Sequence, residues 1–115
     1  RVSVVCPTMS SRQRYHEQLW GCFEAQTWPD KELVVVETYG DAPSKFLKRK
    51  AREDPRLVYF SIRVPSEAED FNVGLKRSMT LHLASGEFVV NFDDDDLYAP
   101  GYAAAMVGEI RTEAR

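Results

Sequence analysis

Four short apolar runs, with amphipathic segments between them, constrain the fold of this chain most strongly. The runs occupy residues 2–6, 33–36, 57–62 and 88–92, and valine, leucine and aromatic residues dominate them. Each run is apolar at several consecutive positions, which is typical of strands that are covered on both faces of a parallel sheet. The sequence therefore predicts four strands, most of them buried.

Helical patterns fill the intervals between these runs. Helices are predicted over residues 12–26, from Ala42-Pro43-Ser44 to about Glu53, over residues 71–85, and from Pro100 onward. A polar, acidic loop is expected over residues 63–70. The order is then β-α-β-α-β-α-β-α, which predicts an α/β protein with a mostly parallel sheet and helices on both faces.

Composition excludes several classes of protein. The chain has 115 residues, enough for one domain, and a net charge of −3. A net-acidic chain without a basic, aromatic-rich stripe is not expected to bind nucleic acid. No apolar run approaches the roughly 20 residues that span a membrane, so we expect no transmembrane segment. Cys6 and Cys22 are expected to be buried free thiols rather than a disulfide.

A run of four aspartates, Asp93 to Asp96, directly follows the last apolar run. Adjacent carboxylates repel one another, and hard divalent ions such as Mg²⁺ or Mn²⁺ take oxygen ligands of this kind. The alternative is a solvated acidic loop, which is what most charge runs are. The position favours a metal site, because ligands of open α/β sheets bind beyond the carboxyl ends of the strands.

Two other pairs of residues follow predicted strands at the same edge of the sheet. Pro7 and Thr8 come after the first apolar run, and Glu37 and Thr38 come after the second. A loop at this edge can offer backbone groups, a hydroxyl or a carboxylate to a ligand. A plain turn and a solvated acid remain the alternatives.

One arginine is a candidate phosphate ligand. Arg77 lies beside Lys76 in the third predicted helix, and its guanidinium could hold a phosphate by a forked contact. A surface charge is the alternative. The basic side chains over residues 45–52 are expected to form a solvated helix face. His16 and His82 have no partner at metal-ligand spacing.

Four stretches together resemble the family 2 glycosyltransferases. They are VSVVCPT at residues 2–8, AQTWPD at 25–30, ELVVVE at 32–37 and ASGEFVVNFDDDDLYAP at 84–100. The resemblance implies a Rossmann-like GT-A fold and transfer of a sugar from a nucleoside-diphosphate donor to an acceptor hydroxyl, generally with inversion. Residues 1–115 are then expected to be the nucleotide-sugar-binding part of one GT-A domain, truncated after the DxD motif and without its acceptor-binding half.

The resemblance also implies roles for individual residues. Asp95 is expected to bind Mn²⁺ or Mg²⁺ directly, with Asp93 as a second metal-site residue. The implied donor-binding residues are Pro7, Thr8, Glu37, Thr38, Arg77, Asp93, Asp94 and Asp95. The donor is expected to be a UDP- or GDP-sugar, and the acceptor is unidentified. The catalytic base of the family lies well after the DxD motif and is expected beyond residue 115, so this chain alone is expected to bind a donor without transferring it.

Two departures from the family pattern concern the nucleoside. Thr38 stands where the family has the second acid of a pair, and Met9-Ser10-Ser11-Arg12 replaces the common Tyr-Asn, so neither base selectivity nor base stacking follows from the sequence.

A nucleotidyltransferase and a degenerate, non-catalytic domain are the alternative functions. The glycine-free loop at residues 9–12 counts against the first, and the intact aspartates count against the second. The expected location is the cytoplasm or the cytoplasmic face of a membrane.

Overall fold

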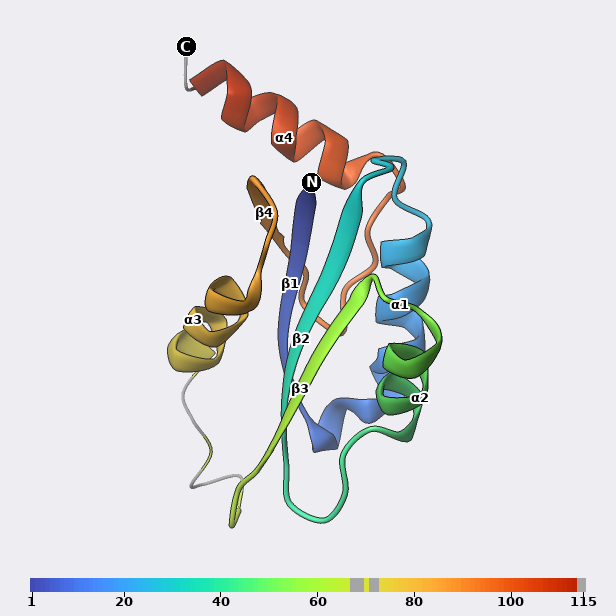
Figure 1. The fold of residues 1–115 in the computed structure, drawn as a ribbon, viewed down its shortest axis with the longest axis vertical. Helices are drawn as coiled ribbons and strands as arrows, with labels where there is room; N and C mark the ends of the chain where they lie inside the picture. The colour runs from blue at the N-terminus through green and yellow to red at the C-terminus, as the bar shows by residue number, and fades with distance from the viewer. Residues whose placement is uncertain (67–69, 71–72, 114–115) are drawn as a thin grey trace.

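The four apolar runs form one parallel sheet in the computed structural model, which describes residues 1–66, 70 and 73–113 (Figure 1). Its strands are β1 (Val2–Met9), β2 (Lys31–Tyr39), β3 (Leu57–Arg63) and β4 (Phe88–Asn91). Their order in the sheet is β3-β2-β1-β4, and every neighbouring pair is parallel. The predicted α/β class with a parallel sheet is confirmed.

Helices connect the strands and cover both faces of the sheet. They are the 3₁₀ helix η1 (Ser10–Tyr15) and the α-helices α1 (His16–Glu24), α2 (Lys45–Glu53), α3 (Val73–Leu83) and α4 (Tyr102–Glu113). Figure 1 shows α1 and α2 on one side of the sheet, α3 on the other, and α4 across the end at which the strands begin. The predicted start of the third helix at residue 71 lies outside the described residues.

The prediction of an α-helix over residues 12–26 is wrong for the first part of that range. Residues 10–15 form the 3₁₀ helix, and only His16–Glu24 are α-helical. Arg12 interrupts the 3₁₀ segment with the non-helical angles φ −111° and ψ 16°. Its side chain binds two aspartates of the acidic run, and we attribute the kink to that long-range contact, which local helical spacing cannot reveal.

Both faces of the central strands are buried, as their consecutive apolar positions predict. One set of side chains packs in the main core cluster, which includes Val4, Cys6, Leu33 and Val35 from the strands and Leu19, Phe23 and Leu47 from α1 and α2. The alternating side chains Val5, Val34 and Val36 are also buried, and α3 contacts β1 and β2. Cys6 is a buried free thiol and Cys22 is a half-buried one.

A buried carboxylate ties the starts of β1 and β2 to the loop before β4. Glu32 accepts hydrogen bonds from the Ser3 hydroxyl, from the Ser85 amide at 2.7 Å and from the Ser85 hydroxyl at 2.8 Å. Ser3 in turn accepts from the Gly86 amide at 2.7 Å. Burial disfavours the ionised form, but the hydrogen bonds from Ser3 and Ser85 outweigh it and lower the pKa of Glu32.

The lowered pKa makes this cluster sensitive to acid. A carboxyl whose pKa is lower in the folded than in the unfolded chain stabilises the fold above its unfolded pKa of about 4.3, and that contribution disappears as the pH falls through the folded pKa. We expect Glu32→Gln to lose about 1–3 kcal/mol of unfolding free energy at pH 7. Between pH 7 and pH 3, it should lose less further stability than the parent chain. Urea denaturation at both pH values, with the exposed Glu53→Gln as control, tests this. Equal pH slopes for Glu32→Gln and the parent would contradict it.

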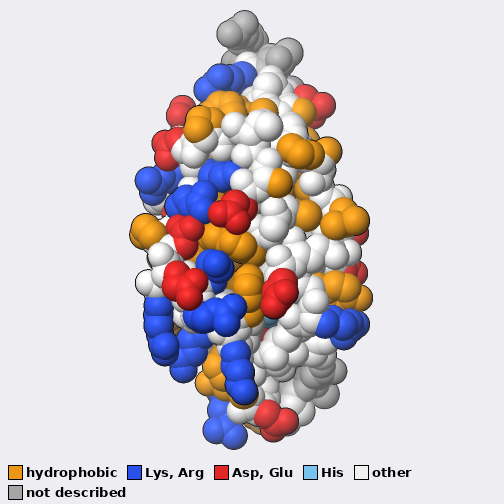
Figure 2. All heavy atoms as spheres, turned by 90° about the vertical axis from the view of Figure 1, so that its right-hand side faces the viewer, with side chains coloured by type: hydrophobic (Ala, Val, Ile, Leu, Met, Phe, Trp, Pro, Cys, Tyr) orange, Lys and Arg blue, Asp and Glu red, His pale blue; other side chains and the backbone are white. Residues whose placement is uncertain are grey.

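The basic side chains of α2 form a solvated face. Ser44 caps the helix by accepting from the Leu47 amide at 3.2 Å, and Arg49 and Lys50 lie within 3.8 and 3.5 Å of Glu53. Figure 2 shows the side of the molecule that carries α1 and α2, where acidic side chains are interspersed among the basic ones. Screened surface pairs of this kind add little to stability.

Within the described residues, no helix has both the length and the hydropathy needed to cross a membrane.

Candidate functional site

Pro7, Thr8, Glu37 and Thr38 were expected to follow the strands, but β1 and β2 extend through them. Strand register still brings these polar residues, at the carboxyl ends of β1 and β2, to the same edge of the sheet as the aspartates after β4. Thr8 is paired with Glu37 between β1 and β2, and Val5 is paired with Asn91 between β1 and β4. The Phe92 amide then donates to the Val5 carbonyl at 2.9 Å, which leads the acidic run alongside the end of β1. Residues more than eighty positions apart therefore meet at this edge.

One cavity of about 340 Å³ collects most of the residues that the sequence singles out. We name it the acidic cavity, and it is lined by Pro7, Thr8, Met9, Arg12, Lys76, Arg77, Asp93, Asp94 and Asp95. Six of the eight predicted donor-binding residues lie here. Arg77, which pattern alone could not separate from an ordinary surface charge, lines the same cavity as the aspartates.

A second cavity, of about 360 Å³, shares Met9 with the first. We name it the strand-end cavity, because it lies where β1 and β2 end. It is lined by Met9, Ser10, Ser11, Gln13, Thr38, Tyr39, Gly40, Asp41, Ala42, Val64 and Asp70. Thr38 is the one predicted donor-binding residue in it.

The aspartates of the acidic run differ in exposure. The Asp94 side chain is 7% exposed and accepts from the Thr8 hydroxyl at 2.7 Å, whereas that of Asp95 is 42% exposed. Asp93 and Asp96 are exposed. The pKa of Asp96 is raised, by partial desolvation first and then by the charges of Asp95 and Asp93. Crowded carboxylates of this kind favour a cation.

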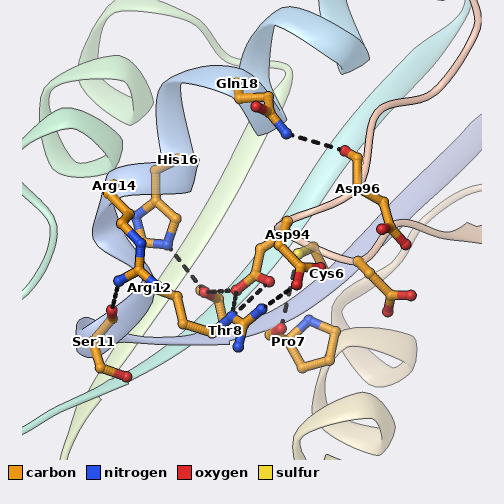
Figure 3. A network of polar contacts seen from close by, with 12 residues as sticks. Cys6, Pro7, Thr8, Ser11, Arg12, Arg14, His16, Gln18, Asp94 and Asp96 are labelled. Carbon is orange, nitrogen blue, oxygen red and sulfur yellow. Dashed lines mark hydrogen bonds and ion pairs between the residues drawn. The ribbon is translucent and has the colours of Figure 1, made fainter.

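A buried histidine supports Asp94 through Thr8 (Figure 3). Because the Thr8 hydroxyl donates to Asp94, it must accept from Nε2–H of His16, which lies 3.0 Å away. His16 is fully buried, and burial lowers its pKa, so the ring is neutral at pH 7. Its Nδ1 has no hydrogen-bond partner in the described part of the chain. Sequence spacing gave no sign of this role.

Glu37 lies fully buried behind the strand-end cavity. Its Oε1 accepts from the Ser44 amide at 2.8 Å and from the Tyr59 hydroxyl, and its Oε2 accepts from Gln13 at 3.2 Å. Burial and the hydrogen bond to Glu37 raise the pKa of Tyr59. In this arrangement both carboxylate oxygens are engaged by the protein, and a direct contact of Glu37 with a ligand stays a prediction.

Thr38 belongs to a buried ion network that the sequence did not reveal. Its hydroxyl donates to Asp70 Oδ2 at 2.6 Å, and Lys76 Nζ donates to that same oxygen at 3.0 Å, to the Thr38 hydroxyl at 3.1 Å and to the Thr8 carbonyl at 3.2 Å. The side chains of Lys76 and Asp70 are 4% and 6% exposed. Asp70 thus places a carboxylate beside Thr38, where the family pattern has an acid on the strand itself. The acidic character of the loop at 63–70 was the only signal for it.

The carboxylates of the acidic run suit a hard divalent cation whose coordination shell is completed by water and a bound ligand. Among residues 1–66, 70 and 73–113, no three His, Cys, Asp or Glu side chains are grouped so as to hold a metal ion. A small divalent ion of the magnesium type commonly takes one or two carboxylates and completes its shell with water and substrate phosphates. The exposed carboxylates of Asp93 and Asp95 fit that pattern.

Comparison with known proteins agrees with this geometry. Residues 3–115 match the profile of the family described as Glycosyl transferase family 2. The chain belongs to this family. The match favours a glycosyltransferase over the nucleotidyltransferase alternative, and no curated protein sequence matches the chain significantly.

Solved structures place this family 2 chain among GT-A glycosyltransferases and confirm the Rossmann-like GT-A fold. TarS from S. aureus, residues 1–349, is 24% identical with a TM-score of 0.76, and the match covers 97% of this chain and 32% of that one. The mannosyltransferase PcManGT from Pyrobaculum calidifontis, solved in complex with GDP-Man and Mn²⁺, is 28% identical with a TM-score of 0.68, and the match covers 87% and 29%. The chain spans about a third of the length of these two solved chains and a fifth of a longer solved chain of TarS.

Proposed function

We propose that residues 1–115 are the donor-binding part of a GT-A glycosyltransferase domain that transfers a sugar from a nucleoside-diphosphate sugar to an acceptor hydroxyl. The observation that carries the proposal is the acidic cavity, which brings Arg77 and three consecutive aspartates together beside the end of β1. An arginine and a metal-binding carboxylate in one cavity suit a diphosphate. The acceptor-binding half and the catalytic base are assigned to residues outside this chain.

Each of the two adjoining cavities would bind a different part of the nucleoside-diphosphate sugar. The diphosphate is assigned to the acidic cavity, and the nucleoside to the strand-end cavity, where Thr38 and Asp70 offer polar groups. Glu37 then supports the nucleoside from behind by fixing Gln13 and the Ser44 amide. The solved structures lend support, because TarS has been solved in complex with UDP-GlcNAc and PcManGT with GDP-Man and Mn²⁺.

Asp95 and Asp93 are the residues that would hold Mn²⁺ or Mg²⁺. A bound divalent ion supplies electrostatic stabilisation of the negative charge on a departing diphosphate. The residues of this chain bind and orient the donor: Arg77 contacts the phosphates, and Thr8 and Arg12 hold Asp94 in place. Transfer by single displacement, with inversion at the anomeric carbon, follows from the family expectation.

Calorimetric titration with UDP and with GDP, each with Mn²⁺ and with EDTA, tests the proposal. Binding of one nucleotide only in the presence of the metal would support it and identify the donor class. A folded chain that binds neither nucleotide would leave two explanations. A longer chain containing the acceptor half separates them, because binding there would show that this half completes the site. If the longer chain also binds neither nucleotide, that result would favour the degenerate, non-catalytic domain.

Arg77 should contribute to donor affinity more than a basic residue elsewhere on the surface. We expect Arg77→Ala to weaken nucleotide binding about tenfold or more, because charge-assisted hydrogen bonds are worth about 1.5–3 kcal/mol. Lys48→Ala on the solvated face of α2 is the matched control and should bind as the parent chain does. Equal nucleotide affinities for the two variants would show that Arg77 is an ordinary surface charge and not a donor-binding residue.

A further inference from the structure

We propose that Arg12 is an internal counter-ion of the acidic run, that it competes with the divalent metal ion for Asp95, and that metal binding moves its guanidinium off that carboxylate. This inference rests on the proposed function, because it concerns the metal site assigned there to Asp95 and Asp93. Arg12 lies in η1, directly after β1, in the segment where the sequence departs from the family pattern, and nothing in the sequence alone assigned it a role.

The contacts of Arg12 place a positive charge on the acidic run. Its Nε donates to Asp94 Oδ1 at 2.8 Å and to Asp94 Oδ2 at 3.0 Å, and its Nη2 donates to Asp95 Oδ2 at 2.6 Å. Figure 3 shows the guanidinium lying against Asp94 beside Thr8. One side chain therefore spans two consecutive carboxylates, and one of them is the expected metal ligand.

The two contacts differ in how readily they can be exchanged. Asp94 is almost fully buried and also accepts from Thr8, so its position is fixed by the protein. Asp95 is 42% exposed, and in the described part of the chain Arg12 is its hydrogen-bonding partner. A ligand arriving from the acidic cavity would therefore displace the guanidinium from Asp95 more readily than from Asp94.

Charge and geometry set Arg12 and the metal ion in competition at Asp95, because the guanidinium occupies its Oδ2. The hydrogen bond and charge of Asp94 raise the pKa of Arg12, so the guanidinium is positive at every accessible pH. An oxygen that accepts a hydrogen bond from a guanidinium has less capacity to coordinate a metal ion, and two cations at one carboxylate repel each other. Metal binding without a nucleotide should therefore be weaker than four adjacent aspartates would suggest.

The test measures the affinity for Mn²⁺ in the absence of a nucleotide. The electron paramagnetic resonance signal of the free hydrated ion gives the concentration of unbound Mn²⁺. At low salt we expect Arg12→Gln to bind Mn²⁺ roughly thirtyfold more tightly than the parent chain, which is the Coulomb effect on a divalent ion of removing one unit charge about 4 Å away in a water-like medium. Arg14→Gln is the matched control. Arg14 is an exposed arginine two positions away that donates to the Ser11 carbonyl, and its variant should match the parent.

Two further variants make the outcome decisive. Arg12→Lys keeps the positive charge but loses the guanidinium that bonds to Asp94 and Asp95 together. The Mn²⁺ affinity of this variant should therefore lie between those of the parent and Arg12→Gln. The double variant Arg12→Gln/Asp95→Asn should bind Mn²⁺ no more tightly than Asp95→Asn alone, which would place the competition at Asp95 and not at the other aspartates. Circular dichroism confirms that each variant is folded.

An Arg12→Gln affinity equal to or weaker than that of the parent would overturn the proposal. A weaker affinity would show that Arg12 orders the acidic run for the metal instead of competing with it. Either result leaves the nucleotide titrations unaffected, so failure of this inference is distinguishable from failure of the proposed function.

Discussion

Replacing Asp95 with asparagine is expected to abolish metal-dependent nucleotide binding while sparing the fold. The substitution keeps the size of the side chain but removes the negative charge that a hard cation needs. Because Asp95 is 42% exposed and its bond to Arg12 is at the surface, we expect the free energy of unfolding to change by less than about 1 kcal/mol. Calorimetry in Mn²⁺ should then give the affinity that the parent chain shows in EDTA.

Asp96→Asn provides the control for Asp95. Asp96 is the next residue in the same run and is exposed, but it does not line the acidic cavity. Its variant should keep metal-dependent binding, apart from the small effect of one fewer negative charge nearby. Unchanged affinity in Asp95→Asn, or an equal loss in both variants, would refute the assignment of the metal to Asp95.

Gly86→Ala is expected to lower the free energy of unfolding by about 2–4 kcal/mol. A methyl group at residue 86 would lie 2.5 Å from the Ser3 hydroxyl oxygen, 2.7 Å from the Ser3 nitrogen and 2.8 Å from the Arg1 carbonyl oxygen. Two of these three atoms belong to the backbone, so rotation of a side chain cannot relieve the clash. The start of β1 must then shift away from the loop before β4. Urea denaturation at pH 7 measures the loss.

Gly21→Ala is the contrasting substitution. Gly21 lies within α1, and a methyl group there would meet no atom within 4 Å. Alanine favours a helix over glycine by about 0.5–1 kcal/mol, so this variant should be as stable as the parent or more stable. If the two variants had the same stability, the close approach at Gly86 would not be the cause of the loss.

Much of the fold could be predicted from local patterns. The consecutive apolar positions of β2, and the aspartates that come soon after β4, depend only on residues close together in sequence. They led to the parallel sheet and to the edge at which we propose that the ligand binds. The register of parallel strands then brought Thr8 and the aspartates to one cavity, as the strand-end argument required, whereas Arg77 lines that cavity from α3.

The remainder depends on contacts between distant residues. Arg12 could not be assigned from its neighbours, because its role depends on Asp94, 82 positions away. In the sequence, Asp70 looks like an ordinary loop acid and Lys76 like an ordinary helix base. Only the structure shows that both contact the Thr38 hydroxyl. Glu37 was expected to follow a strand, but β2 continues through it, and its carboxylate is buried where it accepts from Tyr59 of β3, whose position the sequence pattern leaves open.

The central position of β1 has a consequence for how this site comes into being. Thr8 meets Asp94, which is 86 positions away in the sequence, and that contact requires β4 to pair with β1 on the side opposite β2 and β3. Closing so long a loop is entropically costly, and such non-local pairings slow folding. The acidic run is therefore expected to acquire its arrangement late, once the last strand has docked. Nucleotide affinity would then depend on residues that never approach the ligand but govern that docking.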